Sequence, residues 1–188
     1  MKKLLLVAFL LCSCSSQAEE AYTQALNELV SSKVAEIAKS SILQSAVKAQ
    51  NAKHASLSQS DIDDLDKKWR AENSASDKPL ISATLSNALS KYLAQVKQES
   101  EGVFTEIFVM DNKGLNVGQS DATSDYWQGD EAKWQKTFSV GNGAVHISDL
   151  SKDESTQEIQ VQLSVAVSDA GGNSVIGAIT LGVNLDNL

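Results

Sequence analysis

Cysteine and proline are both rare in this chain of 188 residues, which has two cysteines and one proline. Both cysteines, Cys12 and Cys14, lie close to the N-terminus. If secretion removes that segment, the rest of the chain has no cysteine for a disulfide, a thiolate nucleophile or a thiolate metal site. The stability of the folded part must then come from an ordinary hydrophobic core.

Catalytic signatures are missing as well. The sequence has no G-x-S-x-G nucleophile motif, and His54 and His146 lie far apart without a third residue at a zinc-ligand spacing. Gly171-Gly172 fits a hairpin turn. A phosphate-binding loop would need a helix directly after the glycines, and none is expected there. The acids and amides between Asp111 and Glu131 fit no EF-hand, so turn and capping roles are favoured over a calcium site. We therefore expect a binding protein rather than an enzyme, with no cofactor and no metal.

Long apolar runs are limited to the N-terminus. Met1-Lys2-Lys3 and the apolar residues 4–11 form the n- and h-regions of a secretory signal, and the apolar run is too short to span a bilayer. Ser16-Gln17-Ala18 predicts cleavage after residue 18 and a soluble periplasmic protein. The alternative is a lipobox, Leu11-Cys12-Ser13-Cys14, in which Cys14 would carry the membrane anchor.

Basic residues are outnumbered by acids, and the formal net charge is -8. Cleavage after residue 18 would remove Lys2 and Lys3 and no acid, which moves the charge to -10. Nucleic acids and anionic lipids are bound by clustered Lys and Arg, so neither is expected as a partner.

The first half of the chain has the composition of helices, because Gly and Pro are almost absent between residues 19 and 102. Apolar residues at helical spacing predict one long amphipathic helix from Glu20 to about Ala52. A shorter helix is expected over 57–72, with Ser58 or Ser60 as its N-cap. A third helix should begin near Pro79 and run to about Gly102.

The second half is rich in Val, Ile, Thr and Gly and predicts antiparallel strands. Five strands are expected, at 103–109, 115–118, 144–148, 159–167 and 175–185. Asp111 to Gly114 and Asp169 to Asn173 supply turns, and Ser151 to Thr156 a polar connection. The alternation over 159–167 predicts a strand with one face in water. The sequence thus predicts a single α+β domain over 19–188, in which a helical part (19–102) packs on a five-stranded antiparallel sheet (103–188).

One short segment, 123–134, combines aromatic and acidic side chains. Tyr126, Trp127 and Trp134 would form apolar walls of a ligand pocket. Asp125, Asp130 and Glu131 could accept hydrogen bonds from an amine-bearing ligand such as an amino acid, or a cationic ligand could lie on the indole rings. Phe108 and His146, on neighbouring strands, are expected behind them. The structural alternative is that the two tryptophans are core residues that pack the segment against the sheet. Lys133 either binds the carboxylate of a ligand or is solvated.

The order of these elements resembles the Cache or PDC family of PAS-like extracytoplasmic sensor domains. The resemblance rests on the long first helix, the D-x-x-G turn at Asp111 to Gly114 and the segment Thr123-Ser124-Asp125-Tyr126-Trp127-Gln128-Gly129-Asp130-Glu131-Ala132-Lys133-Trp134. It implies a small-molecule sensor with a PAS-like sheet. Because the chain ends at Leu188, directly after the last expected strand, we expect a free-standing version that signals through a partner, such as a membrane sensor kinase or chemoreceptor.

The alternative function is that of an interaction or structural protein, or a dimerising accessory lipoprotein, without a small ligand. In that case the long first helix would pair with a receptor or with a second copy of the chain, the latter through residues such as Val34 and Ile37. The two functions are compatible, since related sensors often form homodimers through this helix.

Overall fold

The structure is a computed structural model that describes residues 22–154, 157 and 159–188. The predicted signal peptide and lipobox, including Cys14, fall on residues 1–18 and lie outside the described residues. Among the helices that are described, none combines the length and apolarity that crossing a bilayer requires.

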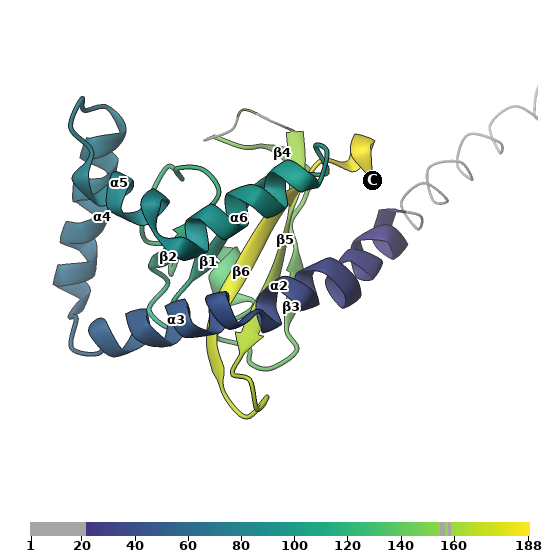
Figure 1. Ribbon diagram of the computed structural model, residues 1–188, viewed down its shortest axis with the longest axis horizontal. Coiled ribbons are helices and arrows are strands. Elements are labelled where there is room, and N and C mark those ends of the chain that lie inside the picture. The colour runs from purple at the N-terminus through teal and green to yellow at the C-terminus, as the bar shows by residue number, and fades with distance from the viewer. Residues whose placement is uncertain (1–21, 155–156, 158) are drawn as a thin grey trace, which may run out of the picture.

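The first helical stretch is broken where a continuous helix was predicted. Residues 22–29 are helical and continue through a π-helical turn, η1 (Val30–Val34), into α2 (Ala35–Lys39). Ser40 is extended, with ψ 139°, and α3 (Ser41–Lys53) follows. The Ser40 hydroxyl donates to the carbonyl of Ile37 at 2.7 Å and accepts from the amide of Leu43 at 3.4 Å. One side chain therefore ends one helix and caps the next, and the two run end to end past the sheet (Figure 1).

The next helix, α4 (Gln59–Asn73), begins as predicted. Ser58 is its N-cap and forms a capping box with Asp61. The predicted third helix is two helices, α5 (Pro79–Ser86) and α6 (Ala88–Glu99).

Asn87 breaks the third helix, with ψ 164°. Its side-chain oxygen accepts from the amide of Ser90 at 2.8 Å, and its side-chain nitrogen donates to the carbonyl of Val117 at 2.9 Å. Asn87 thus caps α6 and links this helix by a hydrogen bond to the strand that contains Val117.

The sheet is antiparallel and has six strands, in the order β2-β1-β6-β5-β3, with β4 paired to β5. The α+β class is therefore confirmed. The expected five strands become six because β4 lies in the segment predicted as a polar connection. The strands are β1 (Phe104–Met110), β2 (Asn116–Gln119), β3 (Val145–Ile147), β4 (Ser151–Lys152), β5 (Ile159–Ser168) and β6 (Val175–Val183).

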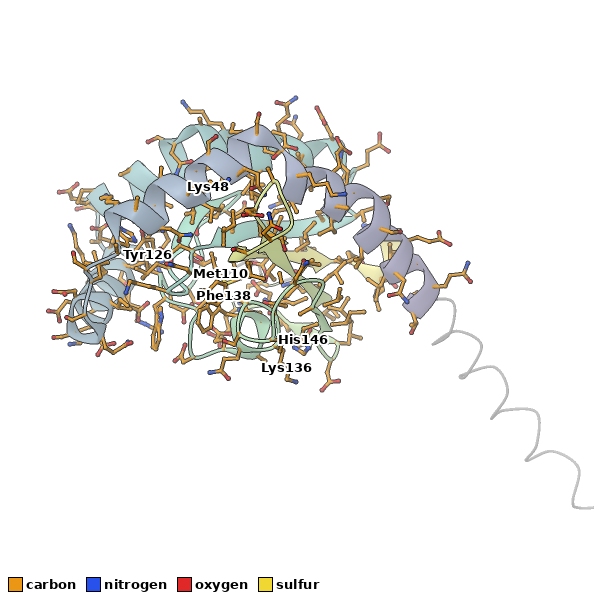
Figure 2. All side chains as sticks on the ribbon, turned by 90° about the horizontal axis from the view of Figure 1, so that it is seen from below. Lys48, Met110, Tyr126, Lys136, Phe138 and His146 are labelled. Carbon is orange, nitrogen blue, oxygen red and sulfur yellow. The ribbon has the colours of Figure 1, made fainter. Side chains whose placement is uncertain are left out.

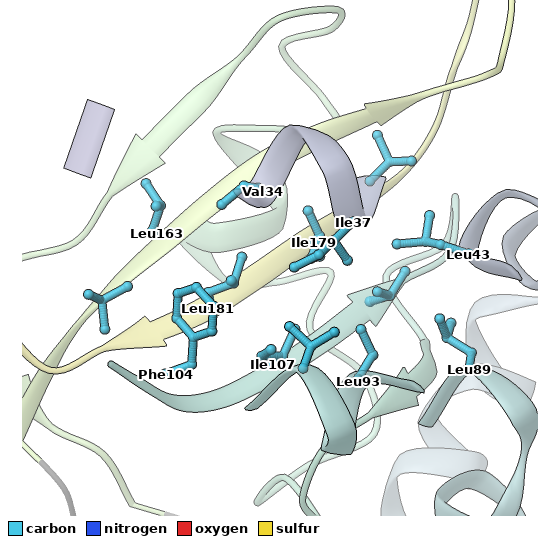
Figure 3. Close-up of a cluster of buried hydrophobic side chains, with 14 of the residues drawn as sticks. Val34, Ile37, Leu43, Leu89, Leu93, Phe104, Ile107, Leu163, Ile179 and Leu181 are labelled. Carbon is cyan, nitrogen blue, oxygen red and sulfur yellow. The ribbon is translucent and has the colours of Figure 1, made fainter. Parts of the chain in front are cut away.

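One face of the sheet holds the main hydrophobic core. Helices α2, α3 and α6 bury their apolar sides there against inward-facing strand residues (Figure 3). Residues from both halves of the chain meet in this core, among them Val34, Ile37, Leu43, Leu89, Leu93, Phe104, Ile107, Leu163, Ile179 and Leu181. The helix face of the sheet is thus an ordinary apolar interior.

The other face, which we call the second face, is buried too, and the prediction that β5 has one face in water is wrong. Gln160 and Ser164 point to this face and are 1% and 0% exposed. The segment 120–143, which contains the short helix α7 (Ala132–Gln135), covers part of it, where Trp134 and Phe138 pack on strand residues. In Figure 2 the side chains of Lys136 and Phe138 lie across the sheet from the purple N-terminal helices.

Candidate functional site

The second face carries a row of side chains that crosses the whole sheet. Strand register places Gln119 opposite Phe108, Phe108 opposite Thr180, Thr180 opposite Ser164, and Ser164 opposite His146. Directly opposed residues of antiparallel strands share a face. All members except His146 are buried, so a mostly polar row lies in the interior.

One end of the second face is apolar. Phe108, Met110 and Ala178 form its floor, and Trp134 and Phe138 pack on it from the covering segment. The rings of Trp134 and Phe138 stack with centroids 4.8 Å apart. The indole of Trp134 donates to the carbonyl of Asp111 at 3.1 Å, which fixes its position over the strands.

The other end is polar. The side-chain amides of Gln160 and Gln162 both donate to Oε1 of Glu106, at 2.7 and 3.1 Å, and Thr105 bonds to Gln160. Gly182 lies opposite Glu106, and a Cβ at Gly182 would collide with the side chains of Gln160 and Thr105. Burial raises the pKa of Glu106, and the charge of Asp153 adds to the increase.

Lys133 brings a cation to this layer. Its Nζ lies 5.3 Å from the centroid of the Phe108 ring, 2.9 Å from Oε2 of Glu131 and 3.1 Å from Oε1 of Gln128. The side chain is 13% exposed. The reading of Lys133 as a solvated lysine is therefore wrong, because its ammonium group turns inward over an aromatic ring.

His146 lies at the far edge of the row, on β3. Partial burial lowers the pKa of His146, the nearby charge of Lys136 lowers it further, and Asp149 opposes the shift. Figure 2 places the Lys136 and His146 side chains close together on the lower side of the molecule.

Three of the predicted pocket residues lie elsewhere, against α4. Tyr126 is buried and stacks on Trp69 with centroids 5.1 Å apart, and burial raises the pKa of Tyr126. The indole of Trp127 donates to the carbonyl of Lys113 at 2.8 Å. Asp125 forms an ion pair with Arg70 at 2.8 Å.

The backbone of the same segment is also held by α4. Oδ1 of Asp66 accepts from the amides of Tyr126 and Trp127, at 2.9 and 3.0 Å. Asp130 is exposed. Of the seven predicted residues, the structure thus gathers Phe108, Trp134 and His146 on the second face and places the others in a separate cluster or on the surface.

Sequence reasoning missed the residues that make the second face polar, namely Glu106, Gln119, Gln160 and Gln162. Their signal was present, since Glu106 is the one charged residue within the apolar strand β1. Gln160 and Gln162 were assigned to a solvated face because alternation alone does not tell whether a second layer covers a sheet. Gln119 lies just beyond the strand predicted at 115–118 and was not assigned to a face.

In the described part of the chain, no three His, Cys, Asp or Glu side chains gather closely enough to hold an ion. A separate groove of about 640 Å³ lies on the helix side of the sheet. It is lined by one side of α3, by residues 87–89 and by Val117.

No protein-family model matches the sequence, and no curated protein does. Among solved structures, the chain is similar to the ligand-binding domain of the Campylobacter jejuni chemoreceptor Tlp3 in complex with 4-methylisoleucine, with 14% identity and a TM-score of 0.41 over 86% of this chain and 59% of that one. It is also similar to the sensor domain of the V. cholerae histidine kinase DctB (16%, TM-score 0.36, 89% and 58%) and to that of E. coli DcuS (18%, TM-score 0.38, 66% and 91%).

This chain therefore spans less than two thirds of the Tlp3 and DctB domains. All three neighbours are described as sensor or ligand-binding domains.

Proposed function

We propose that this protein is an extracytoplasmic small-molecule sensor of the Cache type, and that its ligand binds between the second face and the segment 120–143. The observation that carries the proposal is the buried polar row of Gln119, Thr180 and Ser164, in which Ser164 and Thr180 bond to each other at 3.0 Å and Trp134 and Phe138 pack beside the row on Phe108. Burying polar side chains lowers stability unless their hydrogen bonds are replaced. A ligand that forms hydrogen bonds with these polar side chains would explain why they are kept in the interior.

The contrast between the two faces of the sheet supports this proposal. The helix face is filled with aliphatic and aromatic side chains, as a purely structural layer would be. The second face instead holds the carboxyl group of Glu106, which accepts from two glutamines, and the ammonium group of Lys133, which lies over the Phe108 ring. Apolar walls with a few placed polar groups are typical of small-ligand sites.

The cellular setting is part of the proposal. The predicted signal peptide, residues 1–18, would deliver the protein to the periplasm, with a lipid anchor on Cys14 as the alternative. Ligand binding would then be reported to a membrane partner such as a sensor kinase or a chemoreceptor.

A homodimer through the N-terminal helix remains compatible with this function, but Val34 and Ile37 are not its contact residues. Both side chains are fully buried in the core of a single chain. Replacing them with Asp would unfold the protein rather than separate two copies. An interface on this helix would have to use its exposed side, for example Glu28 and Ser32.

A thermal-shift screen of the purified protein against amines, amino acids and carboxylates, with native mass spectrometry for retained ligands, tests the proposal. Binding to the native state must raise the melting temperature. A ligand that raises it, and whose effect is weakened by Ser164→Val, supports the assigned site. No shift with any class and no retained ligand would contradict the proposed function.

A further inference from the structure

The helix face of the sheet carries a groove that the proposed ligand site does not use. The groove has a volume of about 640 Å³ and is lined along one side by α3, from Ser41 to Lys53. Its other side is the start of α6, Ala88 and Leu89, and its floor is Val117. The volume lies within the range of roughly 300–1,000 Å³ that is typical of small-molecule sites.

Small side chains on α3 keep this groove open. Ser41, Ser45 and Ala49 are spaced four residues apart, so they follow one face of the helix. The helix break at Asn87 makes α6 begin beside this face, and only the first two residues of α6 line the groove. One wall is therefore about 18 Å long, whereas the other is shorter than a helical turn. A partner helix, about 10 Å across, would need two long walls, but a thin flexible chain would not.

Most of the described residues that line the groove are aliphatic, and none of them is aromatic or acidic. The aliphatic ones are Ile42, Ala46, Ala49, Ala88, Leu89 and Val117. Two amide side chains in the lining are already bonded to the strand. Nε2 of Gln50 donates to the carbonyl of Asn116 at 3.1 Å. Nδ2 of Asn87 donates to the carbonyl of Val117 at 2.9 Å. The groove therefore offers a ligand an apolar surface with few polar partners.

Lys53 is the one charged residue among the described residues of the lining. Its side chain is exposed and forms no ion pair with any described residue. The start of α6 lies near this end of α3, because Asn87 and Gln50 bond to the carbonyls of consecutive strand residues and Gln50 is about one helical turn before Lys53. A helix N-terminus carries a partial positive charge. This end of the groove therefore favours an anionic group.

We propose that this groove binds a linear fatty acid, whose alkyl chain lies along the aliphatic side chains of α3 and whose carboxylate pairs with Nζ of Lys53. Burial of the chain supplies most of the affinity, since each methylene that is fully removed from water strengthens binding about fourfold. The ion pair adds less, because Lys53 is exposed, but it fixes the direction of the chain. The groove and the second face lie on opposite sides of the sheet, so the fatty-acid site is independent of the proposed sensor site.

The test is calorimetric titration of the purified protein with octanoate, decanoate and dodecanoate, each below the concentration at which it forms micelles. The affinity should rise by about twofold to fourfold for each added methylene. Decyltrimethylammonium has a cationic head and should bind about tenfold more weakly than decanoate, although the net charge of -8 would favour it elsewhere on the surface. Equal binding of the two decyl compounds would overturn the fatty-acid site.

Two matched pairs of variants on α3 locate the site. Ala49→Trp fills the groove and should weaken decanoate binding about tenfold or more, whereas Ala52→Trp, outside the groove, should leave it unchanged. Lys53→Met should weaken binding about twofold to fivefold, and Lys48→Met should not. All four residues are exposed, so the two members of each pair should melt at similar temperatures. A loss of affinity in only one member then cannot come from unfolding.

The outcomes separate the groove from the sensor site. Decanoate in the groove should leave the indole N–H signal of Trp134 in place, because Trp134 packs on the opposite face of the sheet. Binding that survives Ala49→Trp but is lost in Ser164→Val would overturn the groove site and place the acid on the second face. Equal weakening by Ala49→Trp and Ala52→Trp would indicate unspecific adsorption to α3 and overturn it as well. Absence of binding by all three acids would overturn the groove site and leave the sensor function standing.

Discussion

Nδ1 of His54 lies 3.0 Å from Oδ2 of Asp111, and both side chains are buried. The pair joins the end of α3 to the turn between β1 and β2. Oδ1 of Asp111 accepts from the amides of Lys113 and Leu115, at 2.8 and 3.0 Å. Its backbone carbonyl accepts from Trp134. Asp111 therefore links the helix layer on one side of the sheet to the covering segment on the other.

Replacing this residue should be highly destabilising. Asp111→Ala would leave several buried donors without an acceptor and should lower the free energy of unfolding by about 3–5 kcal/mol. Chemical denaturation measures the change. Asp64→Ala, which removes an exposed partner of Lys67, should change it by no more than about 0.5 kcal/mol. Similar small effects of both variants would contradict the role given to Asp111.

Glu106 should make stability depend on pH. Its ordinary pKa is 4.5, and burial raises the pKa in the folded state. The folded protein thus binds this proton more tightly than the unfolded chain does, so this contribution to stability falls as the pH rises from about 4.5 through the folded pKa.

The isosteric variant Glu106→Gln should be more stable than the wild type at pH 7 and should lose this part of the pH dependence. Denaturation curves across this range test the expectation. Glu99→Gln, at an exposed site, is the control and should keep the wild-type slope. A variant as pH-dependent as the wild type would show that Glu106 is not the group responsible.

The pKa of His146 should lie below its ordinary value of 6.5, chiefly through burial and secondly through Lys136. Lys136→Gln should move it upward, because a nearby positive charge is removed. An NMR titration of the imidazole signals measures this directly, and the chain has only one other histidine. An unshifted pKa in the wild type would mean that the His146 imidazole is more exposed to water than its place in the row on the second face implies.

Trp127 and Asp130 were predicted from the sequence to be ligand contacts, and the structure gives them separate tests. The Trp127 ring packs against Gly114 and Gly129, so Trp127→Ala should lower the free energy of unfolding by about 3 kcal/mol. Asp130→Ala, at an exposed position, should change it by less than about 0.5 kcal/mol. If the Asp130→Ala protein is stably folded but no longer binds the ligand, Asp130 is a ligand contact, as the sequence predicted.

Local signals in the sequence predict much of the fold because they act over a few residues. The N-cap at Ser58, the start of α5 at Pro79 and the turn at Gly114, with φ 83°, are all where the sequence places them. The breaks at Ser40 and Asn87 were not predicted, since neither interrupts the apolar spacing and neither contains Gly or Pro.

The site was harder to predict because it depends on which segments meet across the sheet. Trp134 and Tyr126 are close in sequence, yet one packs on β1 and the other on α4. Gln160 and Ser164 look solvated by alternation, yet both are buried, and their side chains bond to Glu106 and Thr180 on other strands of the sheet. Such long-range packing leaves little trace in a single sequence.

The indole N–H signals of the three tryptophans offer the most direct test of the proposed binding site. Trp69, Trp127 and Trp134 donate to the carbonyls of Thr123, Lys113 and Asp111. Only Trp134 covers the second face. Titration of the ¹⁵N-labelled protein with a compound that raises its melting temperature should shift the Trp134 signal and leave that of Trp69 in place. Movement of the Trp69 and Trp127 signals without that of Trp134 would place the ligand against α4 and contradict the site proposed here.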